Sequence, residues 1–401
     1  MILRSLCTLL VLGIAPLADA RTVIEFWHAQ DATIPTIEAL AEAFNAAQDD
    51  YQVLPRHTGS YRETALRLIA ALGTPNAPVL VDAETTVLPR LAEEGAVLAL
   101  DHWLAELPQE LIEDIYPNLW AVGQLDGRRY GLPWHSSLPV LIYNASIFNQ
   151  LGLAPPQSWE EFEALAGRLT TRHTAGYVVV AAAPIFEALV NSRGGRIVTA
   201  GGQPNFTSPA AIESLAMLQR LAERGHAQVR SFAQFEVAMI DFVRTRAMMS
   251  VAGLAFLPQG QRFAVAFELG LAPLPLAPGG SLPLMGGQLA VVRGASEAEQ
   301  RGALAFWQFL LAPENLQTWI EASYFLPVRR AVVPLLAAWY EANPMARVGL
   351  EQLTYAAPRP QIAAYTVWQE YLEEALERSL LGGMAPEEAL AEAQRRAEAE
   401  R

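Results

Sequence analysis

Hydrophobic positions in this chain follow two spacings, one of two residues and one of about 3.6 residues. Runs of β-branched and aromatic residues at 23–27, 52–55 and 79–81 predict short strands. Between them, the apolar positions from Ile37 to Phe44 and a stretch at 62–72 predict amphipathic helices. This alternation is typical of an α/β fold, in which helices cover both faces of a mainly parallel sheet.

Later helices carry start signals in the sequence. Ser158 with Glu161 three residues on predicts a capping box, and Ser208, followed by proline, predicts another helix start. A third helix is expected over 296–312, before a proline. The Pro- and Gly-rich segment 273–283 predicts an extended crossover between lobes.

The N-terminus has the pattern of a signal peptide over residues 1–20. Arg4 supplies the positive charge, residues 5–15 the apolar stretch, and the small residues before position 21 the cleavage site. The only cysteine, Cys7, lies inside this leader. A lipid-anchored Cys7 is the alternative, but the residues before it are not small enough for such processing. We therefore expect export to the periplasm, cleavage near Ala20, and a mature chain without disulfides.

Composition excludes several classes of protein. The 401 residues are enough for two or three domains, and 52% hydrophobic with 17% charged residues is too apolar for a disordered chain. A net charge of −14 argues against a nucleic-acid or anionic-membrane partner. All 28 cationic residues are arginine, so no lysine is present for a P-loop or a Schiff base.

Catalytic and metal motifs are weak. No Gly-x-Ser-x-Gly occurs, and His135 beside Ser136 is a poor triad because neighbours on extended backbone point apart. The six histidines lack metal-ligand spacing and no calcium loop is present, so we expect no metal and no cofactor. Asp82 and Glu84 could be the paired carboxylates of a secreted glycosidase or lyase. Such acids more often cap a helix or accept hydrogen bonds from a hydroxylated ligand.

Several segments instead favour a small polar ligand. Residues 59–61, 133–137, 286–288 and the Tyr324-Phe325 pair lie after or between predicted strands, where an open α/β sheet presents its ligand crevice. Aromatic rings offer stacking faces, hydroxyls offer directional hydrogen bonds, and glycines allow close approach to backbone N–H groups. The pattern predicts a binding site.

These segments also carry a family resemblance, which runs from the mature start to the last helix. Its motifs include Phe26-Trp27-His28, Asn76-Ala77-Pro78, residues 133–144 (PWHSSLPVLIYN), Ala312-Pro313-Glu314-Asn315 and Pro360-Gln361-Ile362. In these the chain resembles the extracellular solute-binding proteins of ABC importers, and most of all their branch that binds sn-glycerol-3-phosphate.

The resemblance implies a two-lobed type II periplasmic-binding fold, each lobe a mainly parallel sheet flanked by helices and joined by hinge crossings. Lobe 1 would comprise residues 21–132 plus about 284–327, and lobe 2 residues 133–283 plus about 328–401. A monomer of this kind traps a solute by hinge closure and then docks on the permease. It is not an enzyme.

The resemblance also implies the contact residues. Tyr61, Glu84, Ser137 and Gly287 match family positions that contact the solute. Four more positions are expected in the pocket. Trp134 lies within the motif at 133–144. The other three adjoin departures from the family pattern: Ser250 in place of a serine expected near Ala252, Tyr324 beside Phe325, and Arg359 upstream of Ala363.

One departure bears on the solute. The family's phosphate-binding arginine after Pro-Gln-Ile is Ala363 here, and Arg359 or Arg193 would have to replace it. A charge-assisted hydrogen bond contributes about 1.5 to 3 kcal/mol, so its loss weakens binding roughly ten- to a hundredfold. The expected solute is glycerol-3-phosphate or a glycerophosphodiester, with a sugar or oligosaccharide as the alternative.

Overall fold

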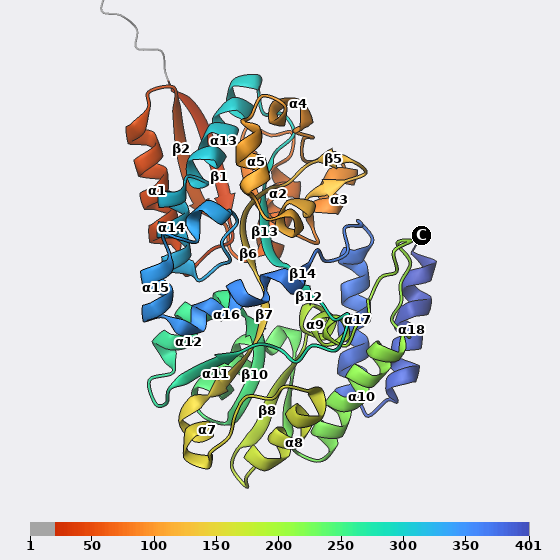
Figure 1. Cartoon of the computed structure of the whole chain (residues 1–401). Coiled ribbons are helices and arrows are strands. Elements are labelled where there is room, and N and C mark those ends of the chain that lie inside the picture. Colours follow the sequence, from red (N-terminus) through yellow and green to blue (C-terminus); the bar gives the residue numbers. More distant parts are fainter. Residues whose placement is uncertain (1–20, 401) are drawn as a thin grey trace, which may run out of the picture.

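The computed structural model describes residues 21–400, in two α/β halves that each surround a five-stranded sheet (Figure 1). The predicted signal peptide lies outside the described residues. The first sheet has the order β2-β1-β3-β13-β6, formed by β1 (Thr22–His28), β2 (Tyr51–His57), β3 (Leu80–Glu84), β6 (Leu132–Ser137) and β13 (Met285–Val291). The second has the order β11-β7-β10-β8-β9, formed by β7 (Pro139–Asn144), β8 (Ala175–Ala181), β9 (Ala227–Ser231), β10 (Ala247–Gly253) and β11 (Leu269–Ala272).

Both sheets are mainly parallel, as predicted. In the first, β1 runs parallel to β2 and β3, and only β13 is reversed, because it pairs antiparallel with both β3 and β6. In the second, only β7 is reversed. Each reversed strand is the one by which the chain enters a sheet from the other half, so the reversals mark the crossings.

Three short connections join the halves. A single residue, Leu138, separates β6 in the first sheet from β7 in the second. Residues 273–283 return from β11 to β13 mostly without regular structure, as the proline and glycine content predicts. Beside them, β12 (Leu282–Pro283) pairs with β14 (Ala356–Ala357), which leads the chain to the C-terminal helices.

The first crossing differs from the boundary expected after residue 132. All of β6 hydrogen-bonds with β13 and belongs to the first sheet, because its apolar residues alternate into that core while β7 begins a separate ladder. The sheets therefore change at Leu138. The assignment of the remaining segments to two lobes stays a prediction.

Helices cover these sheets and form the rest of the chain. The C-terminal pair α17 and α18 packs beside α10 at one side of the second sheet (Figure 1). The α-helices are α1 (Ile34–Ala47), α2 (Tyr61–Ala71), α3 (Leu88–Glu93), α4 (Asp101–Leu104), α5 (Gln109–Asp114), α6 (Pro117–Ala121), α7 (Ala145–Leu151), α8 (Trp159–Leu169), α9 (Ala183–Ser192), α10 (Pro209–Glu223), α11 (Phe235–Val243), α12 (Leu257–Phe263), α13 (Glu297–Leu310), α14 (Pro313–Ser323), α15 (Ala337–Ala342), α16 (Pro344–Gln352), α17 (Tyr365–Leu380) and α18 (Pro386–Ala399). A two-stranded hairpin, β4 (Gln124–Leu125) with β5 (Arg128–Arg129), completes the fold.

Helix caps follow the sequence signals with one exception. Ser208 caps α10, and Ser296 with Glu299 forms a complete capping box at α13. At α8, Ser158 accepts from the Glu161 N–H, but the Glu161 carboxylate accepts from the N–H of Gln157, one residue earlier than a capping box requires. Only one of the two hydrogen bonds of the predicted capping box is therefore formed.

Removing the α13 cap tests this account. Ser296→Ala should lower the free energy of unfolding by about 1 kcal/mol, because the N–H of Glu299 loses its acceptor. Ser296→Asp keeps an acceptor and should retain most of the stability. Chemical denaturation of the three proteins measures the difference, and equal midpoints would contradict the role of the cap.

Candidate functional site

A buried polar network lies at the edge of the first sheet where β1, β3 and β13 meet. The amide of Gln30, which follows β1, donates to the Tyr61 hydroxyl at 2.7 Å and to Asp82 Oδ2 at 2.9 Å. The Gly287 N–H lies 3.4 Å from His135 Nδ1, so the ring proton is on Nε2 and is donated to Asp82 Oδ1 at 3.0 Å. Asp82 thus accepts two hydrogen bonds while only 1% exposed.

Gly287 is required here for a steric reason. A Cβ at this position would lie 2.0 Å from Asp82 Oδ1 and 3.0 Å from the Tyr61 hydroxyl. In the sheet Gly287 pairs with Glu84 on one side and His135 on the other. Burial and the Asp82 charge raise the pKa of Tyr61 well above its usual range, so its hydroxyl keeps its proton.

A second network crosses from the first sheet to the helices of the second half, and Arg359 is its centre. Arg359 Nη1 donates to Glu84 Oε1 at 2.8 Å, at the end of β3. Its Nε donates to Glu187 Oε2 on α9 at 2.9 Å, and its Nη2 donates to Gln369 Oε1 on α17 at 2.6 Å. The side chain is only 3% exposed. One guanidinium therefore bridges both halves.

Further hydrogen bonds extend this crossing. The Tyr365 hydroxyl donates to Glu187 Oε2 at 2.9 Å, and the Gln369 amide donates to the Thr86 hydroxyl at 3.1 Å. Thr86 in turn donates to Glu84. Burial opposes the charge of Arg359, but the carboxylates of Glu187 and Glu84 outweigh it and place the pKa of Arg359 above its usual range. The bridge is permanently charged.

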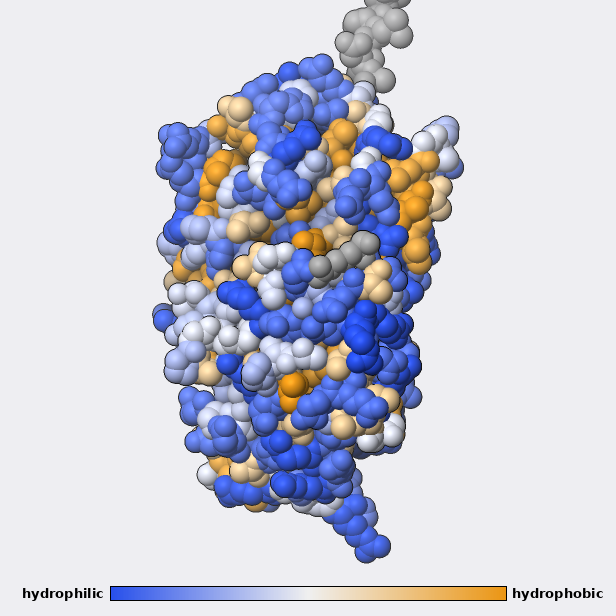
Figure 2. Space-filling view, turned by 90° about the vertical axis from the view of Figure 1, so that its right-hand side faces the viewer, coloured by the Kyte–Doolittle hydropathy of each residue, from blue (hydrophilic) through white to orange (hydrophobic). Residues whose placement is uncertain are grey.

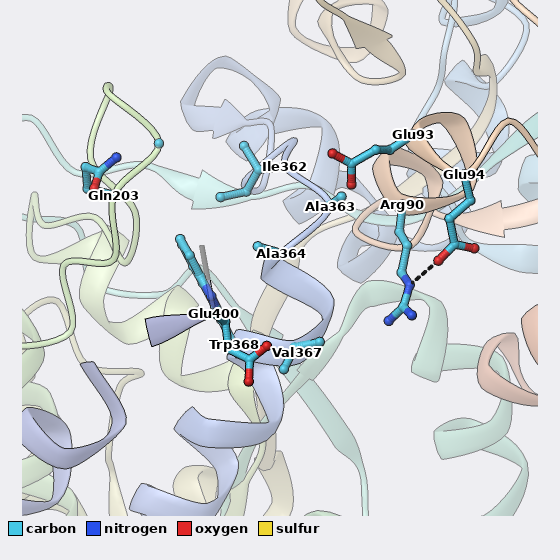
Figure 3. Close-up of a pocket in the computed structure, with 11 residues that line it drawn as sticks. Arg90, Glu93, Glu94, Gln203, Ile362, Ala363, Ala364, Val367, Trp368 and Glu400 are labelled. Atoms are coloured by element: carbon cyan, nitrogen blue, oxygen red, sulfur yellow. Dashed lines mark hydrogen bonds and ion pairs between the residues drawn. The ribbon is translucent and has the colours of Figure 1, made fainter. Parts of the chain in front are cut away.

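A pocket of about 600 Å³ lies between α3 of the first half and the start of α17 in the second (Figure 3). Arg90, Glu93 and Glu94 enter it from α3 and the turn that follows, on the side of the first sheet, and Arg90 bonds Glu94 at 2.8 Å. The opposite wall comes from the second half and is lined by Gly202, Gln203, Ile362, Ala363, Ala364, Val367, Trp368 and Glu400.

A smaller pocket of about 270 Å³ shares Gly202 and Ile362 with this one, so the two pockets adjoin. We call the two pockets, together with the bridge of Glu84, Arg359 and Glu187, the seam between the halves. Glu187 lies in the wall of the smaller pocket, and Arg196 is its cationic residue. The surface on this side of the molecule is mostly hydrophilic, with its larger hydrophobic areas in the upper half (Figure 2). The seam can therefore hold a polar molecule against groups from both halves.

The structure brings four of the expected site residues together and places a fifth, Ser137, at the crossing. Tyr61, Glu84 and Gly287 are neighbours at the edge of the first sheet, and Arg359 bonds Glu84 from the other half. Ser137 lies at the end of β6, where its Oγ accepts from a backbone N–H in the second half, at 3.2 Å from Ala255 N. Their contact with a solute stays a prediction.

Three expected residues lie elsewhere. Trp134 is 1% exposed and stacks on Trp319 at 4.5 Å between ring centroids, and its ring lies edge-on to that of His135 at 4.9 Å, so it is buried in the core beside the network. Ser250 is buried in β10, where its hydroxyl donates to a carbonyl of β8. Tyr324 follows α14 with φ of 59°, and its hydroxyl lies 3.2 Å from both Gln261 Oε1 and Asn343 Oδ1, either of which can accept its proton. Arg193, the other arginine considered for a phosphate, lies over the Trp159 ring.

Sequence reasoning missed Glu187, Gln30 and Gln369. A signal for Glu187 was present, since it is the one charged residue in the apolar helix α9 (APIFEALVNS) and a buried charge needs a partner. Its partner is 172 positions away, and no local pattern indicates that distance. The two glutamines carry no comparable signal.

The geometry gives little support to carboxylate catalysis. Asp82 is buried and held by Gln30 and His135, while Glu84 bonds Arg359, so the two acids have different partners. Within residues 21–400, no group of three or more His, Cys, Asp or Glu side chains could hold a metal ion. In the same range, no helix is both long and apolar enough to cross a bilayer.

Gly287→Ala tests the first network. The new methyl group would displace the Asp82 carboxylate, and we expect a loss of about 1 to 3 kcal/mol in unfolding free energy. Gly201→Ala is the matched control, because its nearest atom would be 3.8 Å away. Chemical denaturation of both variants decides, and similar midpoints would contradict the steric argument.

His28 predicts a pH dependence of stability. Burial lowers the pKa of His28 to about 4, although the Asp82 charge acts in the opposite direction. The unfolded chain therefore binds a proton that the folded chain does not, so stability is full above about pH 6.5 and falls toward pH 4. His28→Gln should make this fall shallower by about 1 kcal/mol per pH unit, whereas exposed His173→Gln should not. Equal slopes of stability against pH in the natural protein and both variants would contradict the assignment of this dependence to His28.

Comparison with known sequences agrees with this architecture. The chain is 24% identical over 412 residues to the sn-glycerol-3-phosphate-binding periplasmic protein UgpB of Escherichia coli K12, covering 95% of this chain and 93% of that protein. It is also 24% identical over 380 residues to the UgpB protein of Yersinia pseudotuberculosis, covering 89% and 86%.

Two solved structures share the fold. UgpB from Mycobacterium tuberculosis in complex with glycerophosphocholine superposes with a TM-score of 0.83 at 24% identity, covering 94% of this chain and 97% of that one. The GacH receptor of Streptomyces glaucescens, solved unliganded and with acarbose, has a TM-score of 0.83 at 22% identity with the same coverage. Both are two-lobed solute-binding proteins.

The sequence model for bacterial extracellular solute-binding proteins matches residues 39–347. This match spans well over half of the chain, and it agrees with the two sheets, the crossings and the polar seam described above. The chain belongs to the family of bacterial extracellular solute-binding proteins and is a solute-binding protein of the ABC-importer type.

Proposed function

We propose that this protein captures a small hydroxyl-rich solute in the seam between its two halves and delivers it, unchanged, to the permease of an ABC importer. The observation that carries this proposal is the seam itself, where Glu84 from the first sheet meets Arg359 and Glu187 from the other half. Glu187 also lines a pocket of about 270 Å³, which adjoins the larger pocket of about 600 Å³. A solute that contacts both halves stabilises the closed form, because neither half alone offers all of its contacts.

The residues along the seam suit hydroxyl groups. Glu84 and Glu93 offer carboxylate acceptors, Gln203 offers an amide, and Tyr61 lies beside Gly287 with its hydroxyl held by Gln30. We assign to Tyr61 and Glu84 the first contacts with the solute, and to Ser137 and Gly287 supporting contacts at the crossings.

Two solute classes fit this description. The curated relatives bind sn-glycerol-3-phosphate, which favours glycerol-3-phosphate or a glycerophosphodiester. The GacH receptor was solved with acarbose, which favours a sugar or oligosaccharide. One observation supports the second class: Ala363 lines the pocket and offers no charge for a phosphate, while each nitrogen of Arg359 already donates to a protein oxygen.

We place the working protein in the periplasm. The sequence of residues 1–20 supports export, and the curated relatives are periplasmic proteins. A monomer suffices, because one chain supplies both walls of the seam.

A thermal-shift panel tests the solute class. It should contain glycerol-3-phosphate, glycerophosphocholine, glycerol, maltose and trehalose. A true solute at 100 times its dissociation constant should stabilise the protein by about 2.7 kcal/mol. A shift by the neutral compounds alone would exclude the glycerol phosphate class, and turnover of any compound on incubation would contradict transport.

A variant of Tyr61 tests the location of the site. Tyr61→Ala should weaken binding of whichever compound shifts the protein by at least tenfold, because it removes a ring and a hydroxyl from the seam. Tyr355→Ala, at a tyrosine that is 49% exposed, is the matched control and should bind normally. Titration calorimetry measures the affinity of both variants, and full affinity in Tyr61→Ala would show that the solute binds elsewhere.

A further inference from the structure

Glu187 is a buried carboxylate that the fold places at an unusual position. It is the one charged residue of α9, it is 1% exposed, and it accepts from Arg359 and from the Tyr365 hydroxyl at 2.9 Å each. A buried charge is costly unless it is paired, and replacing such a pair by apolar residues is often neutral or stabilising. Stability alone therefore does not explain why this residue is a carboxylate. The effect of Glu187 on the charges along the seam does explain it.

That effect is to hold Arg359 between two carboxylates. Nε donates to Glu187 and Nη1 to Glu84, so two negative charges face one positive charge. A phosphate that contacts Arg359 must either displace one of these carboxylates or lie with its own negative charge close to both of them. Displacement would leave a buried or partly buried carboxylate without its partner.

The rest of the seam also carries a net negative charge. Five carboxylates along it face three guanidinium groups, and Arg90 is already bonded to Glu94. The carboxylates are Glu84, Glu93, Glu94, Glu187 and Glu400, and the arginines are Arg90, Arg196 and Arg359. A dianion entering this seam meets net repulsion, which weakens slowly with distance where water is excluded.

Neutral hydroxyl groups meet no such penalty. A guanidinium has five N–H donors, and three of those of Arg359 are used by Glu84, Glu187 and Gln369. Two N–H groups remain, and an oxygen that reaches them can accept without displacing a carboxylate. A hydroxyl does so without bringing a negative charge close to Glu84 and Glu187, as a phosphate would. The same hydroxyl can donate to Glu84.

We infer that Glu187 is a specificity-determining residue: by holding Arg359 against α9, it makes the seam reject phosphate dianions and accept uncharged, hydroxyl-rich solutes. This inference rests on the proposed function, in that it takes the seam to be the solute site. It assigns to Ala363 and Glu187 one combined effect, since the first brings no cation to the larger pocket and the second holds Arg359 in an ion pair.

Glu187→Gln tests the inference. Glutamine keeps the size of the side chain and an acceptor oxygen for Arg359 Nε, but it removes the charge. At pH 8, where inorganic phosphate and glycerol-3-phosphate are mainly dianions, titration calorimetry at fixed ionic strength should show at least tenfold tighter binding of both by the variant than by the natural protein. The ratio of affinity for the phosphate compounds to affinity for the neutral compound that binds the natural protein should rise at least tenfold.

Glu213→Gln is the matched control, since it removes the same charge from a side chain on α10 that is 57% exposed and bonded to Arg220. It should gain no phosphate binding. An equal gain in this control would overturn the inference, and so would the absence of any gain in Glu187→Gln.

The natural protein alone gives a second test that does not depend on the variant folding. It should bind neither phosphate compound more tightly than the neutral one, and the opposite order would overturn the inference. The two proposals can fail separately. If no hydroxylated compound binds the natural protein, the proposed function fails for that panel, whereas a gain of inorganic phosphate binding in Glu187→Gln still supports the role of Glu187.

Discussion

The ion pairs of Arg359 are the interaction on which the arrangement of the two halves depends. The guanidinium is almost fully buried, yet it takes its partners from β3, α9 and α17. In such an environment an unpaired charge costs several kcal/mol, so the pairs constrain where these three elements can lie. Separation of the halves would break the Glu84 contact and leave Arg359 with Glu187. The guanidinium therefore belongs to the second half, with Glu84 as its detachable partner.

Much of the fold follows from local patterns in the sequence. The strands at 22–28, 51–57 and 80–84 and the helices that follow them agree with the apolar spacing, and the segment 273–283 is extended because its prolines and glycines exclude other structure. The position of the first crossing, by contrast, could not be predicted from local patterns in the sequence. Strand pairing decides it, and nothing in residues 132–144 (LPWHSSLPVLIYN) shows where β6 leaves one ladder and β7 enters another.

The site was less predictable than the fold. Tyr61, Glu84 and Gly287 come together because consecutive strand ends meet at one edge of the sheet. Trp134 shows the limit of a motif, since it lies where the pairing of β6 with β13 is irregular and its ring packs in the core against Trp319 and His135. Phe325 rather than Tyr324 packs on the His135 ring, because α14 ends in a left-handed residue that turns Tyr324 away. Contacts between segments more than 150 residues apart, such as Glu187 with Arg359, leave no local trace.

The single-residue link at Leu138 has a mechanical consequence. Because β6 and β7 are nearly one continuous strand, with each end hydrogen-bonded into a different sheet, rotation of one half cannot be absorbed by a slack loop there. A relative rotation of the two halves therefore has to change the backbone torsion angles on either side of Leu138. Relative motion is thereby limited to a swing about an axis close to this residue, and the far ends of the two sheets travel farthest.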